Sequence, residues 1–499
     1  MNFLRGALIL TAAGVAVKIL GAVNRIWLSR LLGAEGIGLY QMAYPVYLLF
    51  AAVAGAGLPI AVSILVAEKL ALGRQGELRQ LLGRLLKLFL LAGVAAAVLV
   101  YAGAGFLVRS GFISDARAYY GIIAVLPAIL LSFAVGVWRG FYQGYQLMMP
   151  TAVSQVAEQF GRVVFMLLLA YWRLPYGLEY AAAGAAGGAG VGAVAALLVL
   201  WGFRKALGEG QAEAMTDSPG RLMRRLVALV VPVSLANLTI PLNALLDMFF
   251  IPTCLLASGL GSREATREFG YLAGMAQPLI LLATIPMSAL VVNLVPAVVR
   301  ERERAAEHIR TAVKMTLLLC VPAGLGMSAL GGPLAMLLYA EPRAGGAMVH
   351  SGPAVILLGL LLVTNGALQG LGQIRWPFFN LLAGLALKIV LLSCWAGDII
   401  ECAWATNAHY ALTLGLNLLA LCYCRIGQCW RDWLKIAAVA GVMALAIGRI
   451  YPALSGCWGA NGAAVAALLV AVGIYAAGIF GCRIVTVEEF GGRRKWLRK

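Results

Sequence analysis

The chain has 499 residues, of which 62% are hydrophobic and only 12% are charged, and its mean hydropathy is +0.89. A water-soluble fold is excluded, because a globular core cannot bury so large an apolar fraction. The formal net charge is +18, but the Lys and Arg residues lie in short clusters between apolar runs. A nucleic-acid-binding protein carries a single basic stripe instead, so this distribution indicates membrane topology and no nucleic-acid partner.

Apolar segments recur along the whole chain, each long enough for the roughly 20 helical residues that cross a hydrocarbon core. Strand-type alternation is absent. The first segment contains Lys18 and lacks a small-residue cleavage site, so we expect a retained helix and no signal peptide. The pattern predicts an all-α polytopic membrane protein with about 14 transmembrane helices. The expected spans are 6–32, 38–66, 85–108, 118–138, 151–172, 181–203, 226–251, 271–298, 315–339, 351–371, 378–397, 403–424, 435–453 and 459–482.

The distribution of basic residues predicts the orientation of these spans. With the N-terminus placed inside, 27 of the 39 Lys and Arg residues fall in cytoplasmic segments and seven in outside segments. Cytoplasmic loops of membrane proteins carry such an excess of positive charge. We therefore expect a multi-pass protein of the bacterial cytoplasmic membrane with both termini in the cytoplasm.

A sequence repeat relates the two halves of the chain. Each copy has a Gln-Gly pair, then a proline, then a cation nineteen residues after the glutamine. The copies are RGFYQG with Pro150 and Arg162, and GALQG with Pro377 and Lys388. The two glutamines, Gln143 and Gln369, are 226 residues apart, and an even number of spans separates them. The pattern predicts two six-helix lobes in a parallel pseudo-twofold repeat, residues 1–225 and 226–425, followed by two helices and a basic tail at 426–499.

Two cations lie on one stripe of the first expected helix, 6–32. Thr11, Lys18 and Arg25 recur every seven residues, and Ser29 follows four residues later. A cation at mid-bilayer depth costs about 2.5–3.5 kcal/mol on insertion scales, so this stripe predicts a hydrated cavity or paired partners. Arg30 lies closer to the outer end, from which its side chain can reach the membrane surface.

A second polar cluster lies on the expected helix 151–172. Gln155, Glu158, Gln159 and Arg162 share one face, and Glu158 and Arg162 form an i, i+4 pair in the favourable order. The pattern leaves two interpretations open: the pair neutralises itself at a helix interface, or it contacts a substrate directly. Lys388, the repeat counterpart of Arg162, has no acidic residue on its own helix and is the better candidate for a cavity cation.

Further polar residues are expected to support the cations. Asp247 lies near the end of its span, where an ordinary interfacial carboxylate is an alternative interpretation. The supporting candidates are Arg30, Arg139, Gln143, Gln155, Glu158, Asn237, Asn243, Asp247, Gln277, Asn365 and Gln369.

The sequence contains no signature of an enzyme. The three histidines are far apart, and neither a phosphate-binding loop nor a GxSxG elbow occurs. Cys422, Cys424 and Cys429 form the only cysteine cluster, and cysteines in membrane helices usually act as small apolar residues. We therefore expect a protein that is not an enzyme and that holds neither a metal nor a cofactor.

Several segments resemble a known family. They are GALILTAAG at 6–14, KILGAVNR at 18–25, SRLLGAEGIGLYQMAYP at 29–45, and RGFYQG followed by PTAVSQVAEQFGR at 150–162. The chain resembles the stage V sporulation protein B group of polysaccharide transporters, within the multidrug, oligosaccharidyl-lipid and polysaccharide (MOP) flippase superfamily. The resemblance implies a V-shaped pair of six-helix lobes and flipping of undecaprenyl-linked peptidoglycan or polysaccharide intermediates, including those of the spore cortex.

The resemblance extends in part to the lipid II flippase, which has cations in an RxLGxxR pattern on its first helix. Lys18 matches the first of them, whereas Asn24 stands at the second and Arg25 is displaced by one position. The arginine that the lipid II flippase has on its second helix finds no counterpart in the expected span 38–66.

The leading hypothesis is a flippase in which Lys18, Arg25, Arg162 and Lys388 bind the pyrophosphate of a lipid-linked saccharide. The main alternative is a cation-coupled multidrug antiporter of the same fold, which needs membrane-embedded acids, and only Glu158 and Asp247 qualify. A second alternative is a non-transporting scaffold that recruits cell-wall enzymes through its basic loops. The expected partners are a lipid-linked saccharide, membrane lipids and cell-wall synthesis enzymes.

Overall fold

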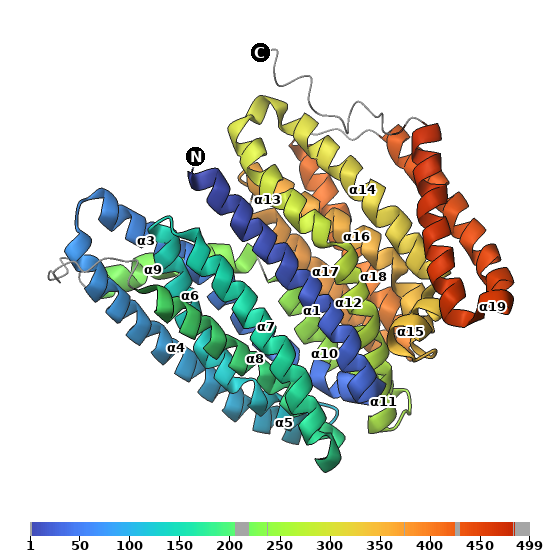
Figure 1. The fold of residues 1–499 in the computed structure, drawn as a ribbon, viewed down its shortest axis with the longest axis horizontal. Helices are drawn as coiled ribbons and strands as arrows, with labels where there is room; N and C mark the ends of the chain where they lie inside the picture. The colour runs from blue at the N-terminus through green and yellow to red at the C-terminus, as the bar shows by residue number, and fades with distance from the viewer. Residues whose placement is uncertain are drawn as a thin grey trace. The chain divides into compact units, whose positions relative to one another are not determined.

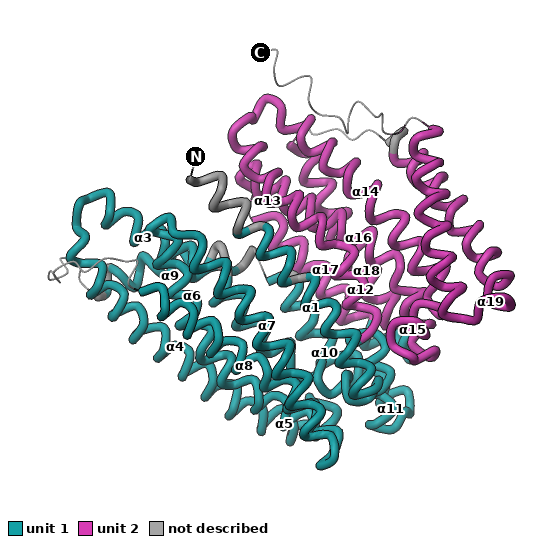
Figure 2. Tube along the Cα trace, in the orientation of Figure 1, with its two compact units in different colours: residues 1–274, 392–399 teal, residues 275–391, 400–499 magenta. Residues whose placement is uncertain are grey.

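The computed structural model describes residues 2–204, 219–236, 238–373, 375–424, 430–482 and 484. These residues form helices joined by short connections, and none of them lies in a strand. Contacts divide the chain into two compact units, which Figure 2 colours separately. Unit 1 comprises Met1–Gly274 and Leu392–Ile399, and unit 2 comprises Met275–Leu391 and Ile400–Lys499. The expected division into 1–225, 226–425 and 426–499 stays a prediction.

Unit 1 contains eleven described α-helices and a π-helical turn, η1, between the second and third of them (Figure 1). They are α1 (Asn2–Gln41), α2 (Tyr44–Ala52), η1 (Val53–Gly57), α3 (Leu58–Ala71), α4 (Gln75–Arg109), α5 (Ala118–Ala124), α6 (Leu126–Gly144), α7 (Met148–Arg173), α8 (Leu178–Gly202), α9 (Pro219–Ala236), α10 (Thr239–Ala257) and α11 (Ser262–Phe269). A second π-helix, Gly270–Ala276, follows α11 and continues into unit 2.

Unit 2 is built from the remaining long helices. They are α12 (Gln277–Ala283), α13 (Ile285–Arg300), α14 (Ala305–Ala329), α15 (Gly331–Tyr339), α16 (Ala344–Gly370), α17 (Arg375–Cys394), α18 (Ile399–Tyr423) and α19 (Trp430–Gly481). The last residues of α17 and the first of α18 belong to unit 1.

The expected all-α membrane protein is confirmed, and the count of spans is roughly consistent with the expected 14. Within the described residues, eleven helices are long and apolar enough to cross a membrane, and twelve if the bent pair Ser262–Ala283 and Ile285–Arg300 is one span. The expected spans 435–453 and 459–482 both lie in α19, which consists of two helices that meet at a break of the backbone at Gly459, where φ is 69°. The expected span 403–424 forms α18, but its buried Asn, Thr and His residues lower its hydropathy.

Glycines at four-residue spacing bring the helices of unit 1 into backbone contact. Gly184, Gly188 and Gly192 of α8 face α7, and a Cβ at any of them would lie 2.5–2.7 Å from an α7 backbone atom. Figure 1 shows these two helices running side by side. Small residues at this spacing let membrane helices pack closely. The packing fixes which face of α7 turns away from α8 and therefore where its polar residues lie.

The helix α1 is broken at Gly33, where φ is 66°, a value that glycine adopts without strain. The segment after the break packs on α11. Backbone approaches backbone there, because a Cβ on Gly38 would collide with the Thr266 carbonyl and one on Gly270 with the Ala34 carbonyl. Gln41 adds a hydrogen bond from its side-chain amide to the Ala273 carbonyl.

An ion network joins the α4–α5 loop to α1 and α11. Arg117 donates to Asp115 (Nη2 to Oδ2, 2.7 Å) and to Glu35 (Nη1 to Oε1, 2.7 Å). Thr266 of α11 also donates to Asp115, at 2.9 Å. Burial alone would raise the pKa of the Asp115 carboxyl, but the hydrogen bonds from Arg117 and Thr266 outweigh it and hold that pKa below its usual value.

Candidate functional site

Three charged side chains meet between α6 and α7. Glu158 accepts one hydrogen bond on each carboxylate oxygen, from Arg162 Nη2 at 2.7 Å and from Arg139 Nη2 at 2.8 Å. Arg139 Nε also donates to Ser154 Oγ at 3.0 Å. The structure thus joins Glu158 to Arg162, the i, i+4 pair of the sequence, and adds Arg139 from a different helix. The side chains of Arg139, Glu158 and Arg162 are only 10%, 17% and 12% exposed.

Tyrosines of α1 and α2 complete this cluster. Arg162 donates to the hydroxyl groups of Tyr47 (2.7 Å) and Tyr44 (3.3 Å). Its guanidinium carbon lies 5.1 Å from the centre of the Tyr47 ring, and that of Arg25 lies 5.2 Å from the Tyr44 ring. Tyr40 stacks on Tyr44 with ring centres 5.1 Å apart. Sequence reasoning missed these tyrosines, although their spacing in YQMAYPVY places them on one helix face.

Arg25 reaches the tyrosines because of its register on α1. The neighbouring Asn24 is buried and donates its side-chain amide to the Met166 sulfur of α7 at 2.8 Å. One residue turns a helix by about 100°, so the cation at 25 faces α2 while the amide at 24 faces α7. Arg30 is exposed. The side chain of Lys18 lies outside the described residues.

The cluster carries more positive than negative charge. Arg25, Arg139 and Arg162 contribute three cations and Glu158 one carboxylate, which leaves two positive charges. A small cavity of about 50 Å³ adjoins the cluster and is lined in part by Tyr47, Ser132, Arg139 and Glu158. Guanidinium groups and tyrosine hydroxyls are donors for an oxyanion, and charge-assisted hydrogen bonds of this kind are roughly twice as strong as neutral ones. The arrangement can therefore bind an anionic group.

A second polar site in unit 1 lies on α10. Asn243 donates its side-chain amide to Asp247 Oδ2 at 3.0 Å, and both side chains are buried. The alternative of an ordinary interfacial carboxylate at Asp247 stays a prediction. Gln143 and Gln155 are half-buried, and Asn237 lies outside the described residues.

A buried polar network crosses three helices of unit 2. Asn417 of α18 accepts from Asn380 of α17 at 2.8 Å and donates to Asn365 of α16 at 2.7 Å. Lys388, two turns beyond Asn380, is completely buried. Gly384 lies between them, where a Cβ would lie 2.6 Å from His409 Nδ1 of α18. Gln277 and Gln369 are half-buried.

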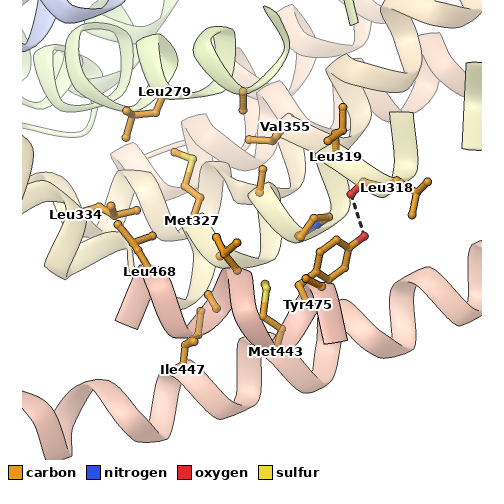
Figure 3. A pocket seen from close by; sticks show the side chains of 17 residues that line it. Leu279, Leu318, Leu319, Met327, Leu334, Val355, Met443, Ile447, Leu468 and Tyr475 are labelled. Atoms are coloured by element: carbon orange, nitrogen blue, oxygen red, sulfur yellow. Dashed lines mark hydrogen bonds between the residues drawn. The ribbon is translucent and has the colours of Figure 1, made fainter. Parts of the chain in front are cut away.

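Unit 2 also contains an apolar cavity of about 450 Å³ between α12, α14, α16 and α19. Figure 3 shows Leu279, Met327, Met443 and Ile447 lining it. Tyr475 is the one tyrosine among the residues that line the cavity, and its hydroxyl donates to the Leu318 carbonyl at 2.9 Å. A charged head group would lose its hydration there without compensation, so this cavity suits hydrocarbon and not an anion.

A multi-pass helical membrane protein with cations gathered at a partly exposed site is typical of a transporter. A family model described as "Polysaccharide biosynthesis protein" matches residues 3–301, more than half of the chain. The chain therefore belongs to the polysaccharide biosynthesis protein family. This membership confirms the resemblance noted in the sequence.

The chain is similar to two proteins of Bacillus subtilis. It is 29% identical over 403 residues to stage V sporulation protein B, covering 78% of this chain and 77% of that one. It is 28% identical over 424 residues to the lipid II flippase MurJ, covering 78% and 76%. The inward closed structure of lipid II flippase MurJ superposes with a TM-score of 0.74 at 15% identity, covering 96% of this chain and all of that one. Similarity to the lipid II flippase supports a protein that is not an enzyme.

Proposed function

We propose that this protein moves an anionic, undecaprenyl-linked saccharide, a peptidoglycan or polysaccharide precursor, from the inner to the outer leaflet by alternating access. The observation that carries the proposal is the cluster in which Arg25, Arg139 and Arg162 outnumber the single carboxylate of Glu158. Similarity to stage V sporulation protein B and to the lipid II flippase supports the same substrate class. Contacts with cell-wall synthesis enzymes stay an expectation from the resemblance.

The substrate group that fits the cluster is the pyrophosphate between lipid and saccharide. Its several oxygens can accept hydrogen bonds from Arg162, Arg139 and the tyrosine hydroxyls. Its negative charge also compensates the two excess positive charges of the cluster. The cluster is only partly exposed, and low dielectric strengthens each of these interactions. Lys18 and Lys388 are proposed as further substrate contacts.

The membrane potential can drive the proposed step. The membrane potential is negative on the cytoplasmic side, where the basic residues predict both termini. An anion therefore gains about 2.3 kcal/mol per charge for each 100 mV on moving outward. A pyrophosphate with about two charges gains about 5 kcal/mol per 100 mV by the same relation. No nucleotide hydrolysis is needed for this direction of transport.

Translocation in proteoliposomes tests the proposal. Labelled undecaprenyl-linked saccharide is placed in the leaflet that corresponds to the cytoplasm, and its arrival in the other leaflet is followed with an impermeant quencher. Wild type should translocate it, whereas Arg25→Gln and Arg162→Gln should not. Arg173→Gln is the matched control, because Arg173 is an exposed arginine at the end of the same helix as Arg162 and contacts Trp172 instead of the cluster.

The same vesicles separate the flippase from a multidrug antiporter. Loading them with a cationic dye and an opposing ion gradient measures drug export. Dye export without saccharide translocation would refute the proposed function. Saccharide translocation that persists unchanged in both cluster variants would refute the assignment of the site.

A further inference from the structure

The carboxylate of Glu158 occupies the place at which the cluster would hold an anion. Its two oxygens each take a different arginine, Arg162 of α7 at 2.7 Å and Arg139 of α6 at 2.8 Å. An oxyanion bound between the two arginines in the place of the carboxylate would take over these two Nη2 contacts. Glu158 and an anion at that place therefore exclude one another.

We propose that Glu158 is an internal competitor for the substrate anion, which the pyrophosphate must displace from Arg139 and Arg162 before it binds. This inference rests on the proposed function and assigns Glu158 the role of setting affinity and release at that site. A lipid-linked anion that binds two arginines without competition would be released slowly, whereas a competing carboxylate restores the closed cluster as the anion leaves.

Both arginines have further contacts that do not involve Glu158. Arg139 is held by Ser154, whose hydroxyl in turn donates to the Thr151 carbonyl at 2.8 Å. Arg162 is held by the hydroxyls of Tyr44 and Tyr47. These contacts do not involve the carboxylate, so displacing it leaves a preformed pair of donors. Pre-organisation of this kind lowers the entropic cost of binding an anion.

The cluster also has an unused donor and a place for the displaced carboxylate. Arg162 Nε is buried and has no hydrogen-bond partner among the described residues. The adjoining cavity of about 50 Å³ is lined by Glu158 itself and by Tyr47 and Ser132, which bear hydroxyl groups. The cavity is larger than the roughly 10–15 Å³ that one water requires, and the polar groups of Tyr47, Ser132 and Arg139 in its lining can bind water beside a carboxylate that has swung away.

The second copy of the sequence repeat contains the cation but not the carboxylate. The offset of 226 residues pairs Arg162 with Lys388 and Glu158 with Gly384. No side chain fits at Gly384, because even a Cβ would lie 2.6 Å from His409 Nδ1. The second copy therefore has the cation without a carboxylate at the position that corresponds to Glu158.

Binding of undecaprenyl pyrophosphate to the purified protein in nanodiscs tests the inference. Glu158→Gln keeps the shape of the side chain but removes the competing charge, so we expect binding to tighten by at least about tenfold, the size of one charge-assisted hydrogen bond. Glu307→Gln is the matched control, because Glu307 is exposed at the start of α14, and it should bind as wild type does.

The outcomes separate the inference from the proposed function. If wild type binds and Glu158→Gln binds equally or more weakly, the competitor role is refuted while the proposed function stands. If wild type, Glu158→Gln and Glu307→Gln all fail to bind the lipid, the proposed function fails and the inference fails with it.

Labelling of the wild-type protein gives a second test that does not depend on a variant folding. An apolar carbodiimide reacts with carboxyl groups in the membrane, and mass spectrometry reports the modified fraction of Glu158. Displacement by undecaprenyl pyrophosphate should free the carboxylate from its two arginines and increase its labelling. Labelling that stays constant or falls at saturating lipid would overturn the inference.

Discussion

Replacing Arg162 by glutamine removes one of the two guanidinium groups on Glu158 and the donors to Tyr44 and Tyr47. A hydrogen bond to a charged group contributes about 1.5–3 kcal/mol. If Arg162 binds the substrate anion, its loss should weaken binding by about 10- to 150-fold, because each 1.4 kcal/mol changes a dissociation constant tenfold. Arg162→Lys should retain part of the affinity, since it keeps the charge but not the forked geometry.

A double variant decides whether Arg162 binds substrate or only neutralises Glu158. In the second case Arg162→Gln fails because Glu158 is left with Arg139 as its charge partner, and adding Glu158→Gln should restore transport to the level of Glu158→Gln alone. In the first case the double variant remains at least about tenfold impaired relative to Glu158→Gln alone, because the missing donor is not replaced.

The measurement is initial translocation of undecaprenyl-linked saccharide in proteoliposomes with equal amounts of folded protein, checked by size-exclusion chromatography. Wild type, both single variants and the double variant form one thermodynamic cycle. Equal rates of the double variant and of Glu158→Gln alone would show that the guanidinium serves the carboxylate alone, and our assignment of Arg162 to the substrate would be wrong.

Three other predictions concern the fold. Arg117→Met should lower the melting temperature at neutral pH. The difference from wild type should shrink as the pH falls below about 4, because the Asp115 carboxylate, whose pKa is lowered in the folded protein, becomes protonated there and loses its stabilising charge. Gly188→Ala should destabilise the protein by about 1–3 kcal/mol, since the new Cβ would lie 2.6 Å from the α7 backbone, whereas Gly202→Ala enters open space and should be neutral in the same thermal-shift assay. Asn417→Leu should lower the free energy of unfolding by about 1–3 kcal/mol, because Asn380 and Asn365 lose their hydrogen bonds with the Asn417 amide. An unchanged melting temperature would contradict this.

The positions of most helices follow from the sequence because hydropathy is a local property. An apolar run of about 20 residues has few alternatives to a helix in a bilayer, where each backbone polar group must be satisfied within the segment. The two helices expected at 435–453 and 459–482 are an example, because the backbone of α19 breaks between them at Gly459, where φ is 69°. A single glycine with positive φ turns the chain there without a polar loop.

The candidate site was predictable only in part. The i, i+4 spacing of Glu158 and Arg162 is visible in the sequence, and the structure joins them. The sequence named Arg139 as a supporting residue but gave no sign that it shares the same carboxylate, because the two residues lie on different helices. The roles of Lys18 and Lys388 stay predictions.

The sequence by itself determined the membrane class, the approximate spans, the repeat and the excess of positive charge, since each depends on composition or on spacing along one segment. Tertiary structure alone decided which charges meet. The glycine stripe of α8 sets the rotation of α7, and the one-residue difference between Asn24 and Arg25 selects which of them faces Tyr44. A helix rotates by about 100° per residue, so the partner of a side chain depends on packing between distant segments that no local pattern contains.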